Sequence, residues 1–333
     1  PKMRTLTDRL AFISTVAIAV GTFVTRPAAV DADGVAFKLH RVGTYRSEAC
    51  GVGDFNGDGK LDIVAGPLLY LASNFGPVKI RELGGEVDED GNGYMYDFMN
   101  LPLDVDGDGR LDVVSCSWHE KRSVWFRNIG VEDGKLWPEK VIEVNGPFEH
   151  GDLWDIDGDG IANEILPGVK HTSWYEIGKQ SDGKQGVLIH VVSQDTRIWG
   201  VGAGDVNGDG RIDILRPDAW FEAPADLRAG DWKPHPLVFG SLDGDKPDHT
   251  PQILVHDVDG DGLNDIITSS AHKYGIFWYR QISEERVGEP KFEQQIIDKS
   301  WSQAHSLTLA DMDGDGDKDL VTGKRFKAHN GKD

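Results

Sequence analysis

Six short segments of the sequence gather acidic side chains at a fixed internal spacing. Each carries Asp or Asn at its positions 1, 3, 5 and 9, and glycine at positions 4 and 6. Carboxylate and amide oxygens at these positions, with the main-chain carbonyl of position 7, form the oxygen cage that Ca²⁺ prefers. The glycines permit the tight turns that wrap a chain around one ion. We therefore expect about six calcium ions, one in each loop.

The residues predicted to hold the ions follow from this spacing. They are Asp54, Asn56, Asp58, Lys60 and Asp62; Asp104, Asp106, Asp108, Arg110 and Asp112; Asp155, Asp157, Asp159, Ile161 and Asn163; Asp205, Asn207, Asp209, Arg211 and Asp213; Asp257, Asp259, Asp261, Leu263 and Asp265; and Asp311, Asp313, Asp315, Asp317 and Asp319. Three of the loops have an asparagine in place of one carboxylate, and we expect weaker binding there. No acidic residue stands at position 12, which excludes an EF-hand.

The charge of the chain supports metal loading of these loops. The formal net charge is −21, and positions 1, 3, 5 and 9 of the six loops together hold 21 aspartates. Without cations these carboxylates would repel one another strongly, so folding and metal binding should be coupled. As a global field, the negative charge disfavours nucleic acid as a partner.

The loops recur at intervals of 50, 51, 50, 52 and 54 residues. Short segments of strand character flank each loop, and an aromatic pair follows in most repeats, as in Trp125-Phe126 and Trp278-Tyr279. Four short strands in about 50 residues is typical of a propeller blade. We predict an all-β protein, a β-propeller of four-stranded blades with six repeats visible and seven blades in the complete protein. Residues 37–42 resemble a fourth strand that would complete the last blade.

The sequence divides into two segments of different composition. Residues 1–32 combine a basic start with an apolar run from Leu10 to Val24, which is typical of a secretion signal peptide. Residues 33–333 form the predicted propeller, with an incomplete C-terminal blade. We expect a secreted, periplasmic or cell-surface protein with no transmembrane span in the mature chain. Cys50 and Cys116 could pair in an oxidising compartment or remain thiols.

The repeats, with a Gly-rich approach before each loop and Asp-(Ile/Val)-(Ile/Val) after most of them, resemble FG-GAP/VCBS repeats of the kind found in integrin α-subunit propellers. The resemblance covers roughly residues 35–325 and implies a calcium-binding propeller. Members of that family include adhesion modules, carbohydrate binders and some lyases, so the resemblance implies no single function. Seven blades are usual in the family, whereas six repeats are visible here.

A second set of residues is predicted on the face opposite the calcium loops. Segments entering the first strands and leaving the second strands of the blades share that face, and seven of the 11 histidines fall in them. The candidate catalytic residues are His150, His249, His305 and Arg216, and the candidate ligand-binding residues are His119, His171, Trp199, His272, Lys324, Arg325 and His329. A concave face that carries these histidine, arginine, lysine and tryptophan side chains suits an anionic or carbonyl-bearing ligand. Single histidines at channel mouths also serve structural roles, and two or three together can hold a transition metal.

Two functions remain open from these residues. The first is a secreted, calcium-stabilised propeller that binds a carbohydrate or an extracellular protein opposite its calcium loops. The alternative is a sugar-active lyase or dehydratase, in which histidine abstracts a proton and arginine or lysine stabilises the enolate. The sequence leaves open whether the protein is an enzyme.

Overall fold

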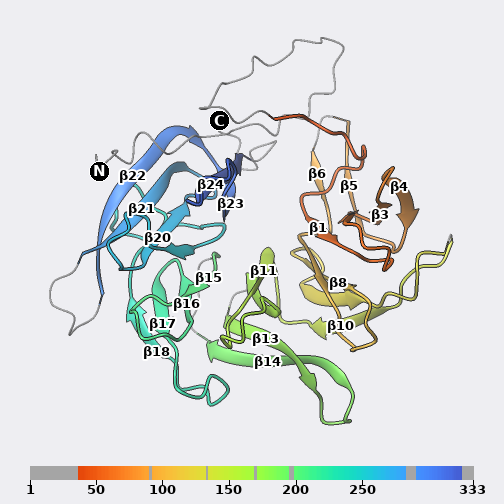
Figure 1. Ribbon diagram of the computed structural model, residues 1–333, viewed down its shortest axis with the longest axis horizontal. Helices are drawn as coiled ribbons and strands as arrows, with labels where there is room; N and C mark the ends of the chain where they lie inside the picture. The colour runs from red at the N-terminus through yellow and green to blue at the C-terminus, as the bar shows by residue number, and fades with distance from the viewer. Residues whose placement is uncertain are drawn as a thin grey trace. The chain divides into compact units, whose positions relative to one another are not determined.

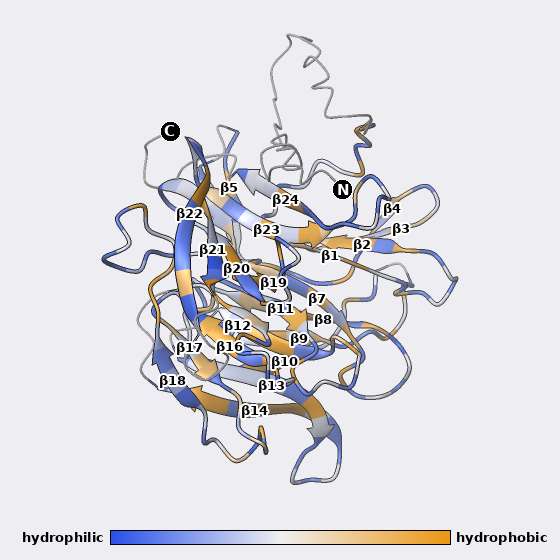
Figure 2. Cartoon of the chain, turned by 60° about the vertical axis from the view of Figure 1, so that its left-hand side comes forward, coloured by the Kyte–Doolittle hydropathy of each residue, from blue (hydrophilic) through white to orange (hydrophobic). Residues whose placement is uncertain are grey.

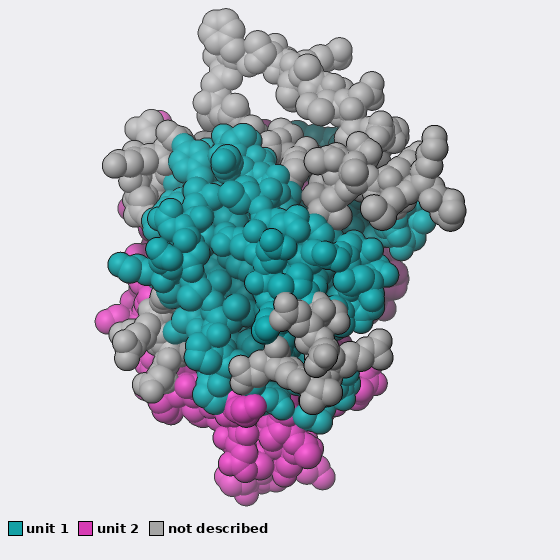
Figure 3. Space-filling model, turned by 90° about the vertical axis from the view of Figure 1, so that its left-hand side faces the viewer, with its two compact units in different colours: residues 1–40, 200–222, 234–333 teal, residues 41–199, 223–233 magenta. Residues whose placement is uncertain are grey.

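The computed structural model describes residues 37–89, 92–132, 134–168, 171–194, 199–282 and 290–324. These residues form strands and turns without a helix. They divide into two compact units, coloured in Figure 3: residues 1–40, 200–222 and 234–333 in unit 1, and residues 41–199 and 223–233 in unit 2. A search of the described residues finds no helix long and apolar enough to cross a membrane. The predicted signal peptide lies outside the described residues.

Unit 2 holds three four-stranded antiparallel sheets and a small hairpin (Figure 1). The first sheet contains β1 (Cys50–Gly53), β2 (Asp62–Ala65), β3 (Leu68–Leu71) and β4 (Gly76–Lys79). The hairpin contains β5 (Gly85–Val87) and β6 (Gly93–Met95). The next two sheets contain β7 (Met99–Leu103), β8 (Asp112–Ser117), β9 (Arg122–Phe126) and β10 (Glu139–Glu143), and then β11 (His150–Trp154), β12 (Glu164–Gly168), β13 (Thr172–Lys179) and β14 (Gln185–Ser193).

Unit 1 continues the same pattern. One four-stranded sheet contains β15 (Gly202–Gly204), β16 (Asp213–Arg216), β17 (Ala219–Glu222) and β18 (Lys233–Pro236). The next contains β19 (Leu254–His256), β20 (Asp265–Ser269), β21 (Tyr274–Ile282) and β22 (Lys291–Ser302). Within the described residues the sixth repeat contributes two paired strands, β23 (Ala304–Ala310) and β24 (Asp319–Lys324).

In every repeat the Asp-rich loop joins the first strand to the second, as the sequence predicts. Strands two and three carry the apolar material, and Figure 2 shows hydrophobic stretches on β12 and β16. The aromatic pairs of the third strands are all buried, including Trp174 and Tyr175 of β13. They pack in apolar clusters inside each unit, such as the one around Phe239, Phe277 and Tyr279 in unit 1. The four-stranded blade pattern is therefore present, and closure into a seven-bladed ring remains a prediction.

Glycines on the first strands allow neighbouring sheets of one unit to approach closely. A Cβ built on Gly202 would lie 1.8 Å from the main-chain oxygen of Ile253, next to β19 in the adjacent sheet. A Cβ on Gly51 of β1 would likewise lie 2.2 Å from the main-chain oxygen of Asn100 in β7. Any side chain at these positions would force the backbones apart, so the Gly-rich approach to the loops has a packing role.

The structure bears on two further expectations, the strand at residues 37–42 and the pairing of the two cysteines. Residues 37–42 form no strand, so the prediction that this segment supplies a fourth strand is not confirmed. Phe37 and Leu39 are 56% and 90% exposed, and the segment therefore buries too little apolar surface to be held in a sheet. Cys50 and Cys116 are both free cysteines, the second one buried.

Adding one methyl group at Gly202, by substitution with alanine, tests the close approach of the two sheets. We expect Gly202→Ala to lower the free energy of unfolding by about 1–3 kcal/mol, because the main chain of the next sheet must move. Gly76→Ala is the control, since its Cβ would meet only the side-chain end of Asn74 at 3.3 Å. Urea unfolding of both variants measures the difference. Equal stability of the two variants would contradict the packing role.

Candidate functional site

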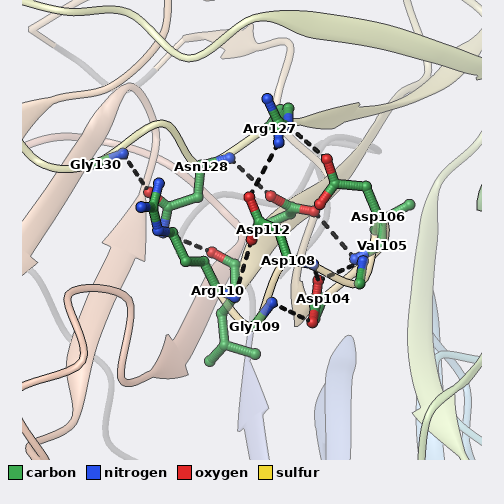
Figure 4. Close-up of polar contacts among 12 residues, drawn as sticks. Asp104, Val105, Asp106, Asp108, Gly109, Arg110, Asp112, Arg127, Asn128 and Gly130 are labelled. Carbon is green, nitrogen blue, oxygen red and sulfur yellow. Dashed lines mark hydrogen bonds and ion pairs between the residues drawn. The ribbon is translucent and has the colours of Figure 1, made fainter. Parts of the chain in front are cut away.

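The second loop shows how one aspartate organises each turn (Figure 4). Asp104 accepts hydrogen bonds at Oδ1 from the N–H groups of Gly107 (2.8 Å) and Asp108 (3.1 Å), and at Oδ2 from Gly109 (2.9 Å). Gly107 and Gly109 have φ of 75° and 84°, a region that glycine adopts without strain. The first, fourth and fifth loops repeat these bonds. The position-1 aspartate therefore folds the loop around its own carboxylate.

The aspartate at position 9 fastens the loop to the sheet. Asp112 is fully buried and accepts hydrogen bonds from the N–H of Val105 (3.0 Å) and from the N–H of Asn128 beyond the third strand (2.7 Å). Asp265 makes the equivalent pair of bonds in the fifth repeat. Burial raises the pKa of Asp112 to about 6, against these two hydrogen bonds, and the charges of Asp106 and Asp108 raise it further. The anion is thus disfavoured in the loop itself, and a bound cation would reverse that effect.

Carboxylate oxygens converge in four of the loops. In each of these sets, one oxygen from every residue lies within 4.8 Å of the others. The sets are Asp104, Asp106 and Asp108; Asp155, Asp157 and Glu164; Asp257, Asp259 and Asp265; and Asp311, Asp313 and Asp315. The Oδ1 atoms of Asp106, Asp155 and Asn163 are buried and have no hydrogen-bond partner in the described part of the chain. Buried hard oxygens without a donor fit Ca²⁺, which takes six to eight oxygen ligands.

Glu164 is the one member of these sets that sequence reasoning missed. Trp154, the last residue before the third loop, pairs with Glu164, whereas in the other repeats the residue before the loop pairs with position 9. The third loop is therefore one residue longer. Glu164 takes the fastening role and accepts the N–H of Ile156 (2.9 Å), while Oδ1 of Asn163 is buried without a hydrogen-bond partner among the described residues. An acidic residue directly after an Asn at position 9 was the available signal.

Arginines from outside the loops neutralise part of this charge. Arg127, just after β9, contacts Asp106 and lies 3.1 Å from Asp108, and Arg280 of β21 lies 2.5 Å and 3.3 Å from Asp259 and Asp261. Arg228 lies 3.7 Å from Asp157 of the third loop. Among ion pairs between described residues, none involves Asp311, Asp313 or Asp315, and all three are exposed. The sixth loop should therefore depend most on a metal ion.

Three of the predicted histidines converge in unit 1. The ring centroids of His249 and His272 are 5.2 Å apart, and those of His272 and His305 are 5.7 Å apart. They come from the segment before β19, the turn between β20 and β21, and β23. A register irregularity in the β23–β24 pairing falls at His305, and such bulges re-aim a side chain. We call these three residues the histidine cluster.

The segments that carry the cluster are tied together by Asp248. Its Oδ1 accepts the N–H of His249 (2.9 Å), and its Oδ2 lies 2.8 Å from Nζ of Lys273. The N–H of Ala271 donates to the main-chain oxygen of His249 at 2.8 Å. Burial lowers the pKa of His249, Asp248 opposes this, and Lys273 lowers the pKa further. His249 is therefore neutral near pH 7, with Lys273 as the adjacent cation.

The other predicted residues have separate surroundings. His119 stacks on Tyr96 with centroids 4.7 Å apart, and His171 Nε2 lies 3.4 Å from Glu143 Oε1. Trp199 lies against Trp118 at 4.9 Å. His150 opens β11, Lys324 ends β24, and Arg325 and His329 lie outside the described residues. Within unit 2, His119 and His171 therefore have different partners.

Arg216 is the predicted catalytic residue whose position speaks most clearly against direct contact with an external ligand. It is 1% exposed on β16, and burial lowers its pKa to about 10, although Asp218 acts to raise it. A side chain this deeply buried supports the sheet more readily than it meets substrate.

Comparison with known proteins identifies the repeats. The family model described as FG-GAP-like repeat matches residues 104–166 and 257–322, which contain the second, third, fifth and sixth loops. The chain therefore carries FG-GAP-like repeats in both of its units, as the sequence resemblance predicts. A comparison with curated protein sequences gives no match.

Several solved structures resemble the chain at low identity. A lectin from Agrocybe aegerita that recognises non-reducing terminal N-acetylglucosamine is 19% identical, with 81% of this chain and 73% of that chain covered and a TM-score of 0.49. The V. cholerae biofilm matrix protein Bap1 is 18% identical, with 78% and 40% covered and a TM-score of 0.43. The Photorhabdus luminescens Tc holotoxin pore is 18% identical, with 81% and 13% covered and a TM-score of 0.35. These TM-scores lie below 0.5, and the likenesses transfer no ligand to this chain.

Metal removal should weaken the fold. We expect a chelator to lower the melting temperature and added Ca²⁺ to restore it, because each site held at about 100 times its dissociation constant contributes about 2.7 kcal/mol. Differential scanning calorimetry measures the change, with Mg²⁺ at equal ionic strength as the control. An unchanged melting temperature in chelator would show that the loops fold without a cation.

The contacts of Arg127 predict opposite effects on the stability of the metal-free protein and on its calcium affinity. Arg127→Gln should destabilise the metal-free protein, because Asp106 and Asp108 lose their countercharge. The same change should raise the calcium affinity of that loop at least fivefold, because it removes repulsion between Arg127 and the bound cation, about 1 kcal/mol for each unit of cation charge at 4 Å in water. Arg122→Gln is the matched control, because Arg122 of β9 pairs with Glu120 and Glu139 instead. Calorimetric calcium titration in which the two variants behave alike would argue against this role of Arg127.

Proposed function

We propose that this protein is an exported, calcium-loaded β-propeller that binds a carbohydrate or protein ligand through the histidine cluster of unit 1. The FG-GAP-like repeats and the four-stranded sheets support the propeller. The loop oxygens support calcium as the bound ion. The observation that carries the ligand site is the convergence of three histidines, from three separate segments, beside Lys273.

The chemistry of the cluster favours a ligand with acidic groups. Lys273 supplies a fixed positive charge, and the three imidazoles can donate hydrogen bonds to carboxylate or carbonyl oxygens. Asp248 partly offsets Lys273 and also holds the main chain at His249. Uronic-acid polysaccharides meet these requirements among carbohydrates, and an acidic peptide meets them among proteins. Metal ions in the loops would act on this site by holding the first strands in place.

A binding panel of neutral and uronic-acid polysaccharides tests this function. We expect acidic members to bind the calcium-loaded protein, with affinity rising as acid protonates His249. Because burial lowers the pKa of His249, this rise should come on the acid side of the usual histidine range. His272→Gln should weaken binding about tenfold or more, the loss of about 1.4 kcal/mol. His40→Gln, at an exposed histidine outside the cluster, should not.

The same panel separates the outcomes. Absence of binding by the folded, calcium-loaded protein to polysaccharides and acidic peptides would refute the proposal. Binding that His272→Gln and His305→Gln leave unchanged would move the site elsewhere. Accumulation of unsaturated sugar products, followed by ultraviolet absorbance, would indicate an eliminating enzyme instead of a binding module.

A further inference from the structure

Unit 2 contains a groove that neither the loops nor the histidine cluster accounts for. It has a volume of about 880 Å³ and lies between β10 and β14. Its lining is Val141, Ile142, Glu143, Val144, Asn145, His171, Ile189, Val191 and Gln194. All these residues belong to unit 2, so the groove is built within one unit.

Both walls of the groove are the edges of sheets. β10 ends the order β10-β9-β8-β7, and β14 ends the order β11-β12-β13-β14. Within the described residues, therefore, no further strand pairs with the outer side of either one. An edge strand presents N–H and C=O groups that an added strand can pair with. β14 offers nine residues, Gln185–Ser193, which is long enough to pair with a short extended peptide.

The rim of the groove is apolar where edge strands are usually protected. Val141, Val144, Ile189 and Val191 are each between 38% and 65% exposed. Ile189 and Val191 are alternate residues of β14, so both project from the same face of the strand. Natural edges usually carry charges or Pro at such positions to prevent strand addition. β10 carries exposed Glu139 and Lys140, but β14 contains no Asp, Glu, Lys, Arg or Pro, so its edge is the one that can accept a strand.

The floor of the groove is a buried carboxylate. Glu143 is 8% exposed; its Oε2 accepts the hydroxyl hydrogen of Tyr175, and its Oε1 lies 3.4 Å from His171 Nε2. The register of β9 and β10 shifts between Val141 and Glu143. This bulge places Ile142 against the apolar cluster of the unit and turns Glu143 toward Tyr175. Burial, then the charge of Glu143, raises the pKa of Tyr175 well above its usual value. Tyr175 therefore remains the hydrogen-bond donor to Glu143.

We propose that this groove binds an extended peptide segment of a partner protein, which pairs with the edge of β14 and places a lysine or arginine over Glu143. β-Branched side chains beside that basic residue would cover Val191 and Ile189. The groove lining contains no Trp, Tyr or Phe on which a sugar could stack, which favours a peptide over a carbohydrate. This proposal does not depend on the function proposed for the histidine cluster.

Selection from a displayed library of random seven-residue peptides, on the calcium-loaded protein, tests the proposal. We expect the enriched peptides to alternate β-branched residues and to carry one central basic residue. The best peptide is then synthesised and its affinity measured by fluorescence anisotropy. Val191→Lys should weaken binding about tenfold or more, because it places a charge on the edge. Ile296→Lys is the matched control, since Ile296 is 46% exposed on β22, the edge strand of another sheet.

A second variant tests the floor of the groove. Glu143→Gln should weaken binding of the basic peptide about tenfold, while an analogue with glutamine in place of the basic residue should bind both proteins equally. Melting temperatures establish that each variant is folded, and Val191→Lys decides the matter if Glu143→Gln is not. No enrichment over the library background would overturn the proposal. The proposal would also be overturned if Val191→Lys left the affinity for the selected peptide unchanged. It would likewise be overturned if His272→Gln weakened that affinity.

Discussion

Repulsion among the carboxylates of each loop is the constraint on which the rest of this structure depends. Each loop brings three or four acidic groups together in a turn of eight or nine residues. Backbone N–H groups take up part of the negative charge, as at Asp104, whose two oxygens accept three hydrogen bonds. Arginines such as Arg127 and Arg280 take up another part in two repeats. The remaining oxygens include Oδ1 of Asp106, which has no hydrogen-bond partner among the described residues, and a calcium ion would coordinate them.

The position-9 carboxylate carries this local balance into the fold. Asp112 and Asp265 each hold the start of their loop with one oxygen and the chain at the end of the third strand with the other. A bound ion would thus fix the relation between the first, second and third strands of a blade. The first strands in turn set the spacing between sheets through close approaches such as Gly202 to Ile253. Loop chemistry and sheet packing are consequently coupled within each unit.

The sequence predicted those features that repeat, because periodic spacing reveals them without knowledge of tertiary contacts. The six loops, their place between the first and second strands, and the buried aromatic pairs all follow from it. Features that depend on a single added residue were missed. Glu164 acts because the third loop is one residue longer, and Glu143 faces inward because of a bulge at Ile142. The strand expected at residues 37–42 failed because its apolar side chains find nothing to pack against.

The candidate ligand residues show the same limit. Topology correctly grouped His249, His272 and His305, since each lies at the same end of its strands. It also included His119 and His171, whose partners Tyr96 and Glu143 are set by an inserted hairpin and by the neighbouring edge strand. Strand order alone cannot reveal such contacts. The proposed division of roles is that metal ions in the loops would hold the strands of a blade, while side chains at the other strand ends would bind the ligand.

The number of calcium ions that the folded protein binds tests most directly whether the six loops are metal sites. Equilibrium dialysis against radioactive calcium, at free concentrations that saturate binding, gives this number. We expect close to six ions per chain, and one fewer when Asp311 is replaced by asparagine. Binding of one ion or none by the folded protein would contradict it, because the loop carboxylates would then be accommodated without metal.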